Sequence, residues 1–496
     1  MGLNIFTDAS NYTRLRASIM IPRLMATQHP DSTRHVGVYD EIGEAIEAYT
    51  KYMCDEVMID YEGKLTPYHQ VEWIIEKAFE RDVKVGEKLL LTPRVPNDSL
   101  EDFSRHTMAV MEAVLANVKA QRLGFKQPVK YVIIPMTENV RDSIRIQRRL
   151  YKIEKVMSEE CGLDPTWFLL VVPLIETADK QVHSDMIAEA FHRALLKEVS
   201  LFVNEIRVFL GKSDSALLYG HVASSVALKI GLSRLHRWGE ERLISVKPIL
   251  GMGKPPFRGH LTPENIDTWT NVWKGYSTVT IQSALRYNTS YDKYLHVVEK
   301  LKQASNIKKP AIIDEDVEAK ILRIVPKLSF SYRRYVVETV ENLYSVFDVI
   351  PSTRERMQYT KYHRIIDGVK IPRAIKFVAG YYTIGLPPTL LDIPGLASLD
   401  DKEVELLLEV YPSIKLDLEH DLKYYSPLIA ANYIQKQLIE EISGKLKVVA
   451  DKLALDIPEA DPSYHKLLGE LVEKRGNPEE SRKIVVKLAE YRGFLG

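Results

Sequence analysis

Cysteine is nearly absent from this chain of 496 residues, which contains only Cys54 and Cys161. Two cysteines are too few for a disulfide framework, and no C-x-x-C pair provides the usual spacing of a metal site. This composition is typical of proteins that work in a reducing compartment. We therefore expect the protein to be cytoplasmic.

Net charge is also missing, because 67 lysine and arginine residues balance 67 aspartate and glutamate residues. A neutral chain has no overall positive field to attract nucleic acid or an anionic membrane, so we expect neither as a partner. Residues 1–24 carry scattered charges and no long apolar run, and we expect neither a signal peptide nor a membrane span there. Any binding site for an anion must be local.

Eight short apolar runs, each followed by polar residues and a helix-length stretch, occupy the first part of the chain. They lie at residues 21–27, 56–60, 88–92, 131–135, 168–175, 206–210, 244–250 and 278–284. Runs that are apolar at almost every position are typical of parallel strands covered on both faces. The alternation predicts an α/β protein with a (β/α)8 TIM barrel over residues 21–290, preceded by an N-terminal extension, residues 1–20.

From residue 291 onward the strand pattern nearly disappears. Long stretches with helical periodicity replace it, at residues 314–349, 374–384, 400–411 and 432–453. They predict an additional C-terminal all-helical region, residues 291–496, packed on the barrel. Within this region, residues 351–373 are rich in arginine and lysine, and the simplest interpretation of that segment alone is a solvated loop.

Two acids, Glu176 and Asp214, follow the fifth and sixth predicted strands. The C-terminal ends of barrel strands form the active-site face, so two carboxylates would lie side by side there. Carboxylate oxygens are ligands that Mg²⁺ and Mn²⁺ prefer. A helix cap remains the alternative for each acid taken alone, but together they favour a metal site.

The same face would carry a histidine and several cations. His29 follows the first strand, Arg94 ends the third, and the glycine-bounded loop 251–259 contains Lys254 and Arg258. A histidine with a pKa near neutrality is a candidate proton acceptor or phosphate partner, although a lone histidine is more often structural. The loop lacks the spacing of a nucleotide-binding motif, and an ordinary turn is its alternative.

Arginines of the predicted helical region add to these cations. Arg354, Arg356 and Arg373, together with Arg94, would provide several guanidinium groups for a dense anion that combines a phosphate with a carboxylate. For each arginine alone, a surface charge is the simpler interpretation.

These motifs resemble, in content and order, the phosphoenolpyruvate carboxylase family, and specifically its short archaeal type. Residues 27–31, Thr-Gln-His-Pro-Asp, are similar to the family's Thr-Ala-His-Pro-Thr. Residues 172–177 (Val-Pro-Leu-Ile-Glu-Thr) and 209–215 (Phe-Leu-Gly-Lys-Ser-Asp-Ser) are similar to its metal-binding segments. Residues 372–375, Pro-Arg-Ala-Ile, resemble its phosphate-binding Leu-Arg-Ala-Ile.

The resemblance implies an enzyme that forms oxaloacetate and phosphate from phosphoenolpyruvate and bicarbonate, through carboxyphosphate and a metal-stabilised enolate. It implies that His29 and Arg258 are catalytic and that Glu176 and Asp214 bind Mg²⁺ or Mn²⁺. It also implies a homotetramer. The substrate-binding residues that it nominates are Arg94, Arg354 or its competitor Arg356, Arg373 and, more loosely, Lys254.

Two departures from the family pattern keep alternatives open. Leu217 stands where the family has a lysine, and Met252 replaces the first arginine of the glycine-rich loop. A Mg²⁺-dependent lyase acting on an oxo acid would also need Glu176 and Asp214, but not so many arginines. A catalytically silent barrel subunit is the third hypothesis.

Overall fold

The computed structural model describes residues 14–15, 20–28, 31–305, 310–352 and 364–496. Three predicted site residues, His29, Arg354 and Arg356, lie outside the described residues. No helix in the described part of the chain is long and apolar enough to cross a membrane.

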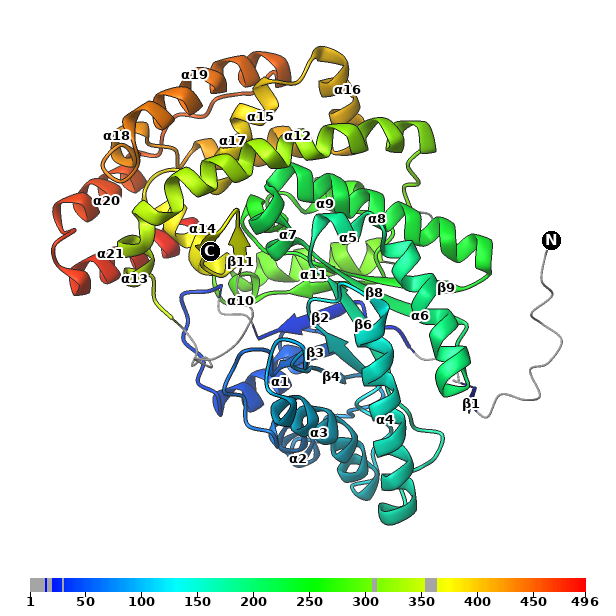
Figure 1. Cartoon of the computed structure of the whole chain (residues 1–496). Helices are drawn as coiled ribbons and strands as arrows, with labels where there is room; N and C mark the ends of the chain where they lie inside the picture. Colours follow the sequence, from blue (N-terminus) through cyan, green and yellow to red (C-terminus); the bar gives the residue numbers. More distant parts are fainter. Residues whose placement is uncertain (1–13, 16–19, 29–30, 306–309, 353–363) are drawn as a thin grey trace.

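Eight parallel strands close into a barrel in the order β10-β2-β3-β4-β5-β6-β8-β9, which confirms the predicted fold class (Figure 1). The strands are β2 (Leu24–Thr27), β3 (Glu56–Asp60), β4 (Leu90–Arg94), β5 (Tyr131–Ile134), β6 (Leu170–Ile175), β8 (Glu205–Gly211), β9 (Ser245–Gly251) and β10 (Thr278–Ile281). A separate parallel pair joins β1 (Arg14–Leu15) to β7 (Leu201–Phe202).

Helices surround this barrel because each buries one apolar face against the strands. In α2, for example, Val71, Ile74, Ile75 and Ala78 are buried at spacings of three and four residues. The outer helices are α1 (Asp40–Thr50), α2 (Gln70–Glu80), α3 (Phe103–Arg122), α4 (Val140–Cys161), α6 (Ser184–Val199), α8 (His221–Arg242), α9 (Ile266–Val272) and α11 (Tyr291–Ala304). Four short elements follow strands at the mouth: α5 (Ala178–Gln181), α7 (Lys212–Tyr219), η3 (Pro256–Arg258) and α10 (Ser283–Tyr287).

Two strand ends affect the site, and one of them differs from the prediction. Arg94 was predicted to end the third strand, beyond the apolar run 88–92, and β4 does end at Arg94, so this arginine belongs to the barrel wall. The predicted eighth strand ran to residue 284, whereas β10 ends at Ile281 and α10 begins at Ser283. Buried apolar residues continue from β10 into α10, so the apolar pattern alone does not show where the strand ends.

The remaining chain forms helices that stack on the barrel (Figure 1). They are α12 (Glu315–Val340), η4 (Glu341–Leu343), α13 (Tyr344–Val349), α14 (Ala374–Thr383), η5 (Pro388–Asp392), α15 (Ile393–Ala397), α16 (Asp401–Val410), α17 (Ile414–Leu422), α18 (Pro427–Ala430), α19 (Lys436–Leu453), α20 (Pro462–Glu473) and α21 (Pro478–Arg492). One continuous cluster of buried apolar residues includes strands of the barrel and helices of this region. The domain boundary at residue 290 stays a prediction.

A β-hairpin interrupts the helices, which the sequence analysis did not anticipate. Strands β11 (Arg364–Ile366) and β12 (Val369–Ile371) pair antiparallel across a two-residue turn. Asp367 and Gly368 form the turn with positive φ angles of 48° and 88°, as the tight hairpin turn requires. Part of the basic segment 351–373 is therefore ordered structure and not a solvated loop.

Candidate functional site

Glu176 and Asp214 meet at the barrel mouth, as predicted. Glu176 directly follows β6, Asp214 lies in the first turn of α7 after β8, and β6 pairs with β8. Neither acid caps a helix in the way the alternative required. The N-cap of α7 is Gly211 and that of α5 is Thr177, and neither cap position has a side-chain capping bond.

The two carboxyls differ strongly in acidity. Burial, assisted by the nearby Asp214 charge, raises the pKa of Glu176 to about 8. Burial also opposes ionisation of Asp214, but the ion pair with Arg364 outweighs it and lowers the pKa of Asp214 to about 2. At pH 7 the metal-free pair therefore carries one proton and one negative charge. A buried and a partly buried carboxyl of this kind fit a hard divalent cation, which would replace the proton.

Arg364 is a member of the site that the sequence analysis missed. It begins β11, is only 3% exposed, and donates to both carboxylate oxygens of Asp214, from Nε at 3.1 Å and from Nη2 at 2.6 Å. Glu176 and Glu62 add attractive charge at this arginine. The hairpin thus delivers a buried cation to the predicted metal ligands.

A second cluster of charges brings Arg94 and Arg373 together. Arg94 donates from Nε and Nη2 to the two carboxylate oxygens of Asp60, at 2.8 and 2.7 Å, and its Nη2 also lies 3.0 Å from Glu62 Oε2. The other oxygen of Glu62 pairs with Arg373, the residue before α14. Glu62 thus bridges a barrel arginine and an arginine of the helical region, both predicted to bind substrate.

Arg258 also lies at the barrel mouth, where several hydrogen bonds fix its side chain. It is 2% exposed and donates to three acceptors, which are Ser213 Oγ at 2.9 Å, Gln282 Oε1 at 2.7 Å and the Gly496 carbonyl oxygen. Ser213 immediately precedes Asp214, so Arg258 lies beside the predicted metal site. Its Nη1 is also 3.6 Å from Asp31 Oδ2.

Lys254 has a different environment from the one we expected for a substrate ligand. Its ammonium donates to the carbonyl oxygens of Asn288 and Gly493, at 3.0 and 2.9 Å, and to Thr289 Oγ1 at 3.1 Å. An ammonium has three protons, so these acceptors use all of them. Lys254 ties the segment around Gly493 to the barrel, and contact with substrate stays a prediction.

The neighbours of His29 contact the barrel mouth, although His29 itself is not described. Gln28 Oε1 accepts from the backbone N–H of Asp60 at 3.2 Å, and Asp31 Oδ1 accepts from the N–H of Ala284 at 2.7 Å.

The two departures from the family pattern are apolar core positions, because Leu217 and Met252 are both fully buried.

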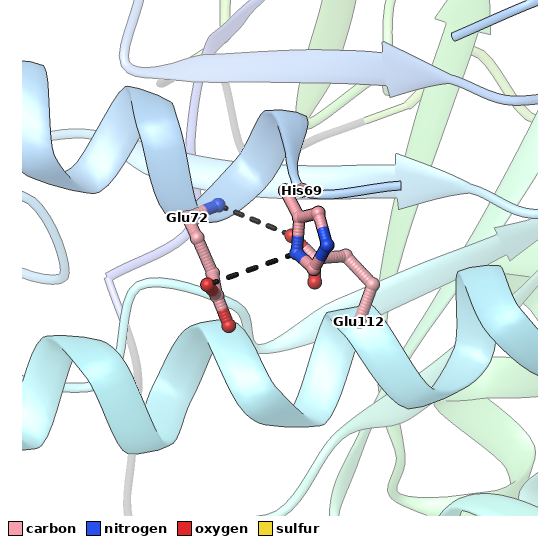
Figure 2. A group of neighbouring side chains, drawn as sticks. All are labelled: His69, Glu72 and Glu112. Atoms are coloured by element: carbon pink, nitrogen blue, oxygen red, sulfur yellow. Dashed lines mark hydrogen bonds and ion pairs between the residues drawn. The ribbon is translucent and has the colours of Figure 1, made fainter. Parts of the chain in front are cut away.

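Another group of possible metal ligands lies between α2 and α3 (Figure 2). His69, Glu72 and Glu112 place one ligand atom each within 4.8 Å of one another, and they share no residue with the site above. Glu112 Oε1 accepts from the Glu72 N–H at 3.2 Å, which satisfies a free donor in the first turn of α2. Burial, reinforced by Glu72, raises the pKa of Glu112 to about 8. Stabilisation of the start of α2 accounts for this group.

A family model and curated relatives indicate the same family. A family model described as phosphoenolpyruvate carboxylase matches residues 21–496. A curated phosphoenolpyruvate carboxylase of Pyrobaculum islandicum is 37% identical over 485 residues, which cover 96% of this chain and 100% of the relative. The corresponding protein of Thermofilum pendens is 37% identical over 482 residues, covering 96% and 99%. That of Methanosarcina barkeri is 30% identical over 526 residues, again covering 96% and 99%.

Proposed function

Because the chain belongs to the phosphoenolpyruvate carboxylase family, we propose that it forms oxaloacetate and phosphate at the barrel mouth around Glu176 and Asp214. The observation that supports this site is the combination of two carboxyls and two arginines at the barrel mouth. Two carboxyls follow neighbouring strands, Arg364 pairs with Asp214 from the hairpin, and Arg258 donates from a barrel loop to Ser213, the residue before Asp214. This is an arrangement for a cation and a multiply charged anion together.

Mg²⁺ or Mn²⁺ bound by Glu176 and Asp214 would stabilise the negative charge that develops on the substrate oxygens. The donor set consists of oxygens only, which suits either ion. Arg364 then has a second role. It neutralises Asp214 in the metal-free protein, and in the loaded protein its charge becomes available to the substrate anion.

Arg94 and Arg373 would bind the phosphoryl group. Both are paired with Glu62 in this structure, so a phosphate entering between them would replace that carboxylate as their acceptor. Arg354 or Arg356 would be a further ligand of the same group. Guanidinium groups on several sides orient the phosphorus for in-line attack by a bicarbonate oxygen, which gives carboxyphosphate and the enolate of pyruvate.

His29 and Arg258 would act in the second half of the reaction. His29 would accept the proton of carboxyphosphate as it breaks into CO₂ and phosphate. Arg258 would hold CO₂ close to the enolate carbon until the new carbon–carbon bond forms. Its burial matters because water entering the site would protonate the enolate and release pyruvate in place of oxaloacetate.

The family resemblance also suggests the oligomeric state and the cellular compartment of the enzyme. We propose a homotetramer in the cytoplasm. The low cysteine content supports the reducing compartment.

The test uses bicarbonate labelled with ¹⁸O, with oxaloacetate measured through malate dehydrogenase. Attack by a bicarbonate oxygen leaves one labelled oxygen in each phosphate that is released, and oxaloacetate appears at the same rate. Phosphate without label, or phosphate release that does not need bicarbonate, would contradict the carboxyphosphate route. No phosphate release from the folded protein would favour the oxo-acid lyase or the silent subunit.

A further inference from the structure

We propose that Asp417, in helix α17 of the helical region, positions Arg258 for carboxylation by fixing His260 of the Arg258 loop. The proposal rests on the function assigned to Arg258 above. It adds a residue outside the barrel that acts on the reaction without touching the substrate. Helix α17 packs directly against η3, the short helix that contains Arg258.

Asp417 is a completely buried carboxylate shared by two histidines. His260 Nδ1 donates to its Oδ1 at 2.5 Å, and His221 Nε2 donates to its Oδ2 at 2.9 Å. The hydroxyl of Tyr411 also donates to Oδ2. Asp417 and His221 are 0% exposed and His260 is 5% exposed, so water competes little for these hydrogen bonds.

These hydrogen bonds stabilise the ionised form of Asp417. Burial alone would favour the neutral acid, but the hydrogen bonds from His221 and His260 hold the pKa of Asp417 well below its usual range. A buried anion of this kind strongly favours the geometry in which both histidines donate to it, because losing a histidine donor leaves its charge poorly compensated. We call the two hydrogen bonds from His221 and His260 to Asp417 the clamp, and we expect them to break rarely in the folded protein.

Because His260 follows Arg258 by two residues in the same loop, fixing His260 also restricts the position of Arg258. The loop closes on itself through hydrogen bonds from Gly253 N to Arg258 O at 2.7 Å and from Leu261 N to Gly253 O at 3.0 Å. His260 has a φ of 55°, a left-handed conformation that is uncommon for residues other than glycine. The bond to Asp417 holds the side chain of this strained residue and thereby fixes the direction in which the loop leaves Arg258.

The second histidine connects the clamp to the metal site. His221 starts α8 and follows α7, the helix that contains Asp214. Asp417 is thus bonded to the segments that follow two adjacent strands, β8 and β9. A single carboxylate of the helical region therefore joins the loop of Arg258 to the start of α8, which directly follows the helix of Asp214.

The position of Arg258 decides whether the enolate reacts with CO₂ or is protonated by water. A small displacement of Arg258 leaves phosphoryl transfer possible but allows CO₂ to escape and water to enter. We therefore expect loss of the clamp to change the ratio of pyruvate to oxaloacetate more than the rate of phosphate release.

The experiment compares three variants of the full chain. His260→Asn keeps a residue that tolerates positive φ but is too short to retain the bond, and Asp417→Asn keeps the shape but removes the charge. Tyr411→Phe is the matched control, because it removes one donor to Asp417 and leaves both histidines in place. Each is measured for pyruvate and oxaloacetate per phosphate, and for hydrogen exchange of loop 251–261 without substrate.

We expect the pyruvate share to rise roughly tenfold or more in His260→Asn and Asp417→Asn, together with faster exchange in the loop, and to stay unchanged in Tyr411→Phe. Unchanged exchange in the first two variants would overturn the clamp. Faster exchange with an unchanged product ratio would overturn its effect on Arg258. A native chain without bicarbonate-dependent phosphate release would instead overturn the proposed function, and the exchange data would still test the clamp.

Discussion

Arg364 and Asp214 form a two-point ion pair between residues 150 positions apart in the sequence. One partner is in a hairpin of the helical region and the other in the first turn of a barrel helix. Arg364 donates to both carboxylate oxygens of Asp214, which are the atoms that would hold a divalent cation. Competition between Arg364 and the metal ion is therefore part of the binding equilibrium.

Substitution of Arg364 should affect metal and substrate in opposite directions. Arg364→Gln removes the competing cation, so Mn²⁺ binding without substrate, followed by electron paramagnetic resonance, should tighten roughly tenfold, in line with loss of a charge-assisted hydrogen bond. The KM for phosphoenolpyruvate should rise at the same time. Arg333→Gln is the control, since Arg333 makes an exposed ion pair with the same hairpin at Asp367. Weaker Mn²⁺ binding in Arg364→Gln would contradict this account.

The two carboxyls proposed to bind the metal should respond differently to amide substitution. Glu176 is protonated at pH 7 in the metal-free protein, so Glu176→Gln should change the free energy of unfolding by less than about 1 kcal/mol. Asp214→Asn leaves Arg364 buried without its partner charge and should cost about 3 to 5 kcal/mol. Both variants should lose Mn²⁺ binding. Denaturant unfolding at pH 7 checks the contrast, and equal destabilisation by the two substitutions would disagree with it.

Lys254 provides a test between a structural and a substrate-binding role. Lys254→Met removes three hydrogen bonds that tie Gly493 to the loop at residues 288–289, so hydrogen exchange of residues 492–496 should accelerate. Because Arg258 donates to the Gly496 carbonyl, the pyruvate share should rise as well. A higher KM for phosphoenolpyruvate with unchanged exchange would show that Lys254 binds substrate directly.

Stability should depend on pH through Glu112. Its pKa in the folded protein, about 8, lies above the ordinary value of 4.5, so the folded state keeps a proton that the unfolded state has released. The stability that this proton provides is present at pH 4.5 and is lost as pH rises toward 8. Native protein and Glu112→Gln should unfold at similar temperatures at pH 5, and the variant should be a few degrees more stable at pH 9. A constant difference across this range would contradict the shifted pKa.

Much of the barrel could be predicted from the sequence because buried parallel strands have a simple pattern. The run 56–60 coincides with β3, and the positions of Glu176 and Asp214 follow from the order of the strands. The strand ends were less predictable. The apolar run 278–284 continues past the end of β10 at Ile281. Arg94 was expected at a strand end, but its partner Asp60 on the neighbouring strand is not apparent from the local sequence.

Arg364 shows why part of the site was missed. In a segment rich in arginine and lysine, each cation looks like a surface charge, and only Asp214, far away in the chain, makes burial of Arg364 favourable. A local signal was nevertheless present, because Asp367-Gly368 between two β-branched residues is typical of a tight hairpin. Glu62 was missed for the same reason, since its bridging role requires Arg373 from the other region.

The most direct test of the central claim is the amount of oxaloacetate and pyruvate formed per phosphate released, with and without bicarbonate, for the native chain and Arg258→Ala. We expect about one oxaloacetate per phosphate in the native chain, no phosphate without bicarbonate, and mainly pyruvate in Arg258→Ala. Phosphate release by the native chain that does not depend on bicarbonate would contradict the central claim.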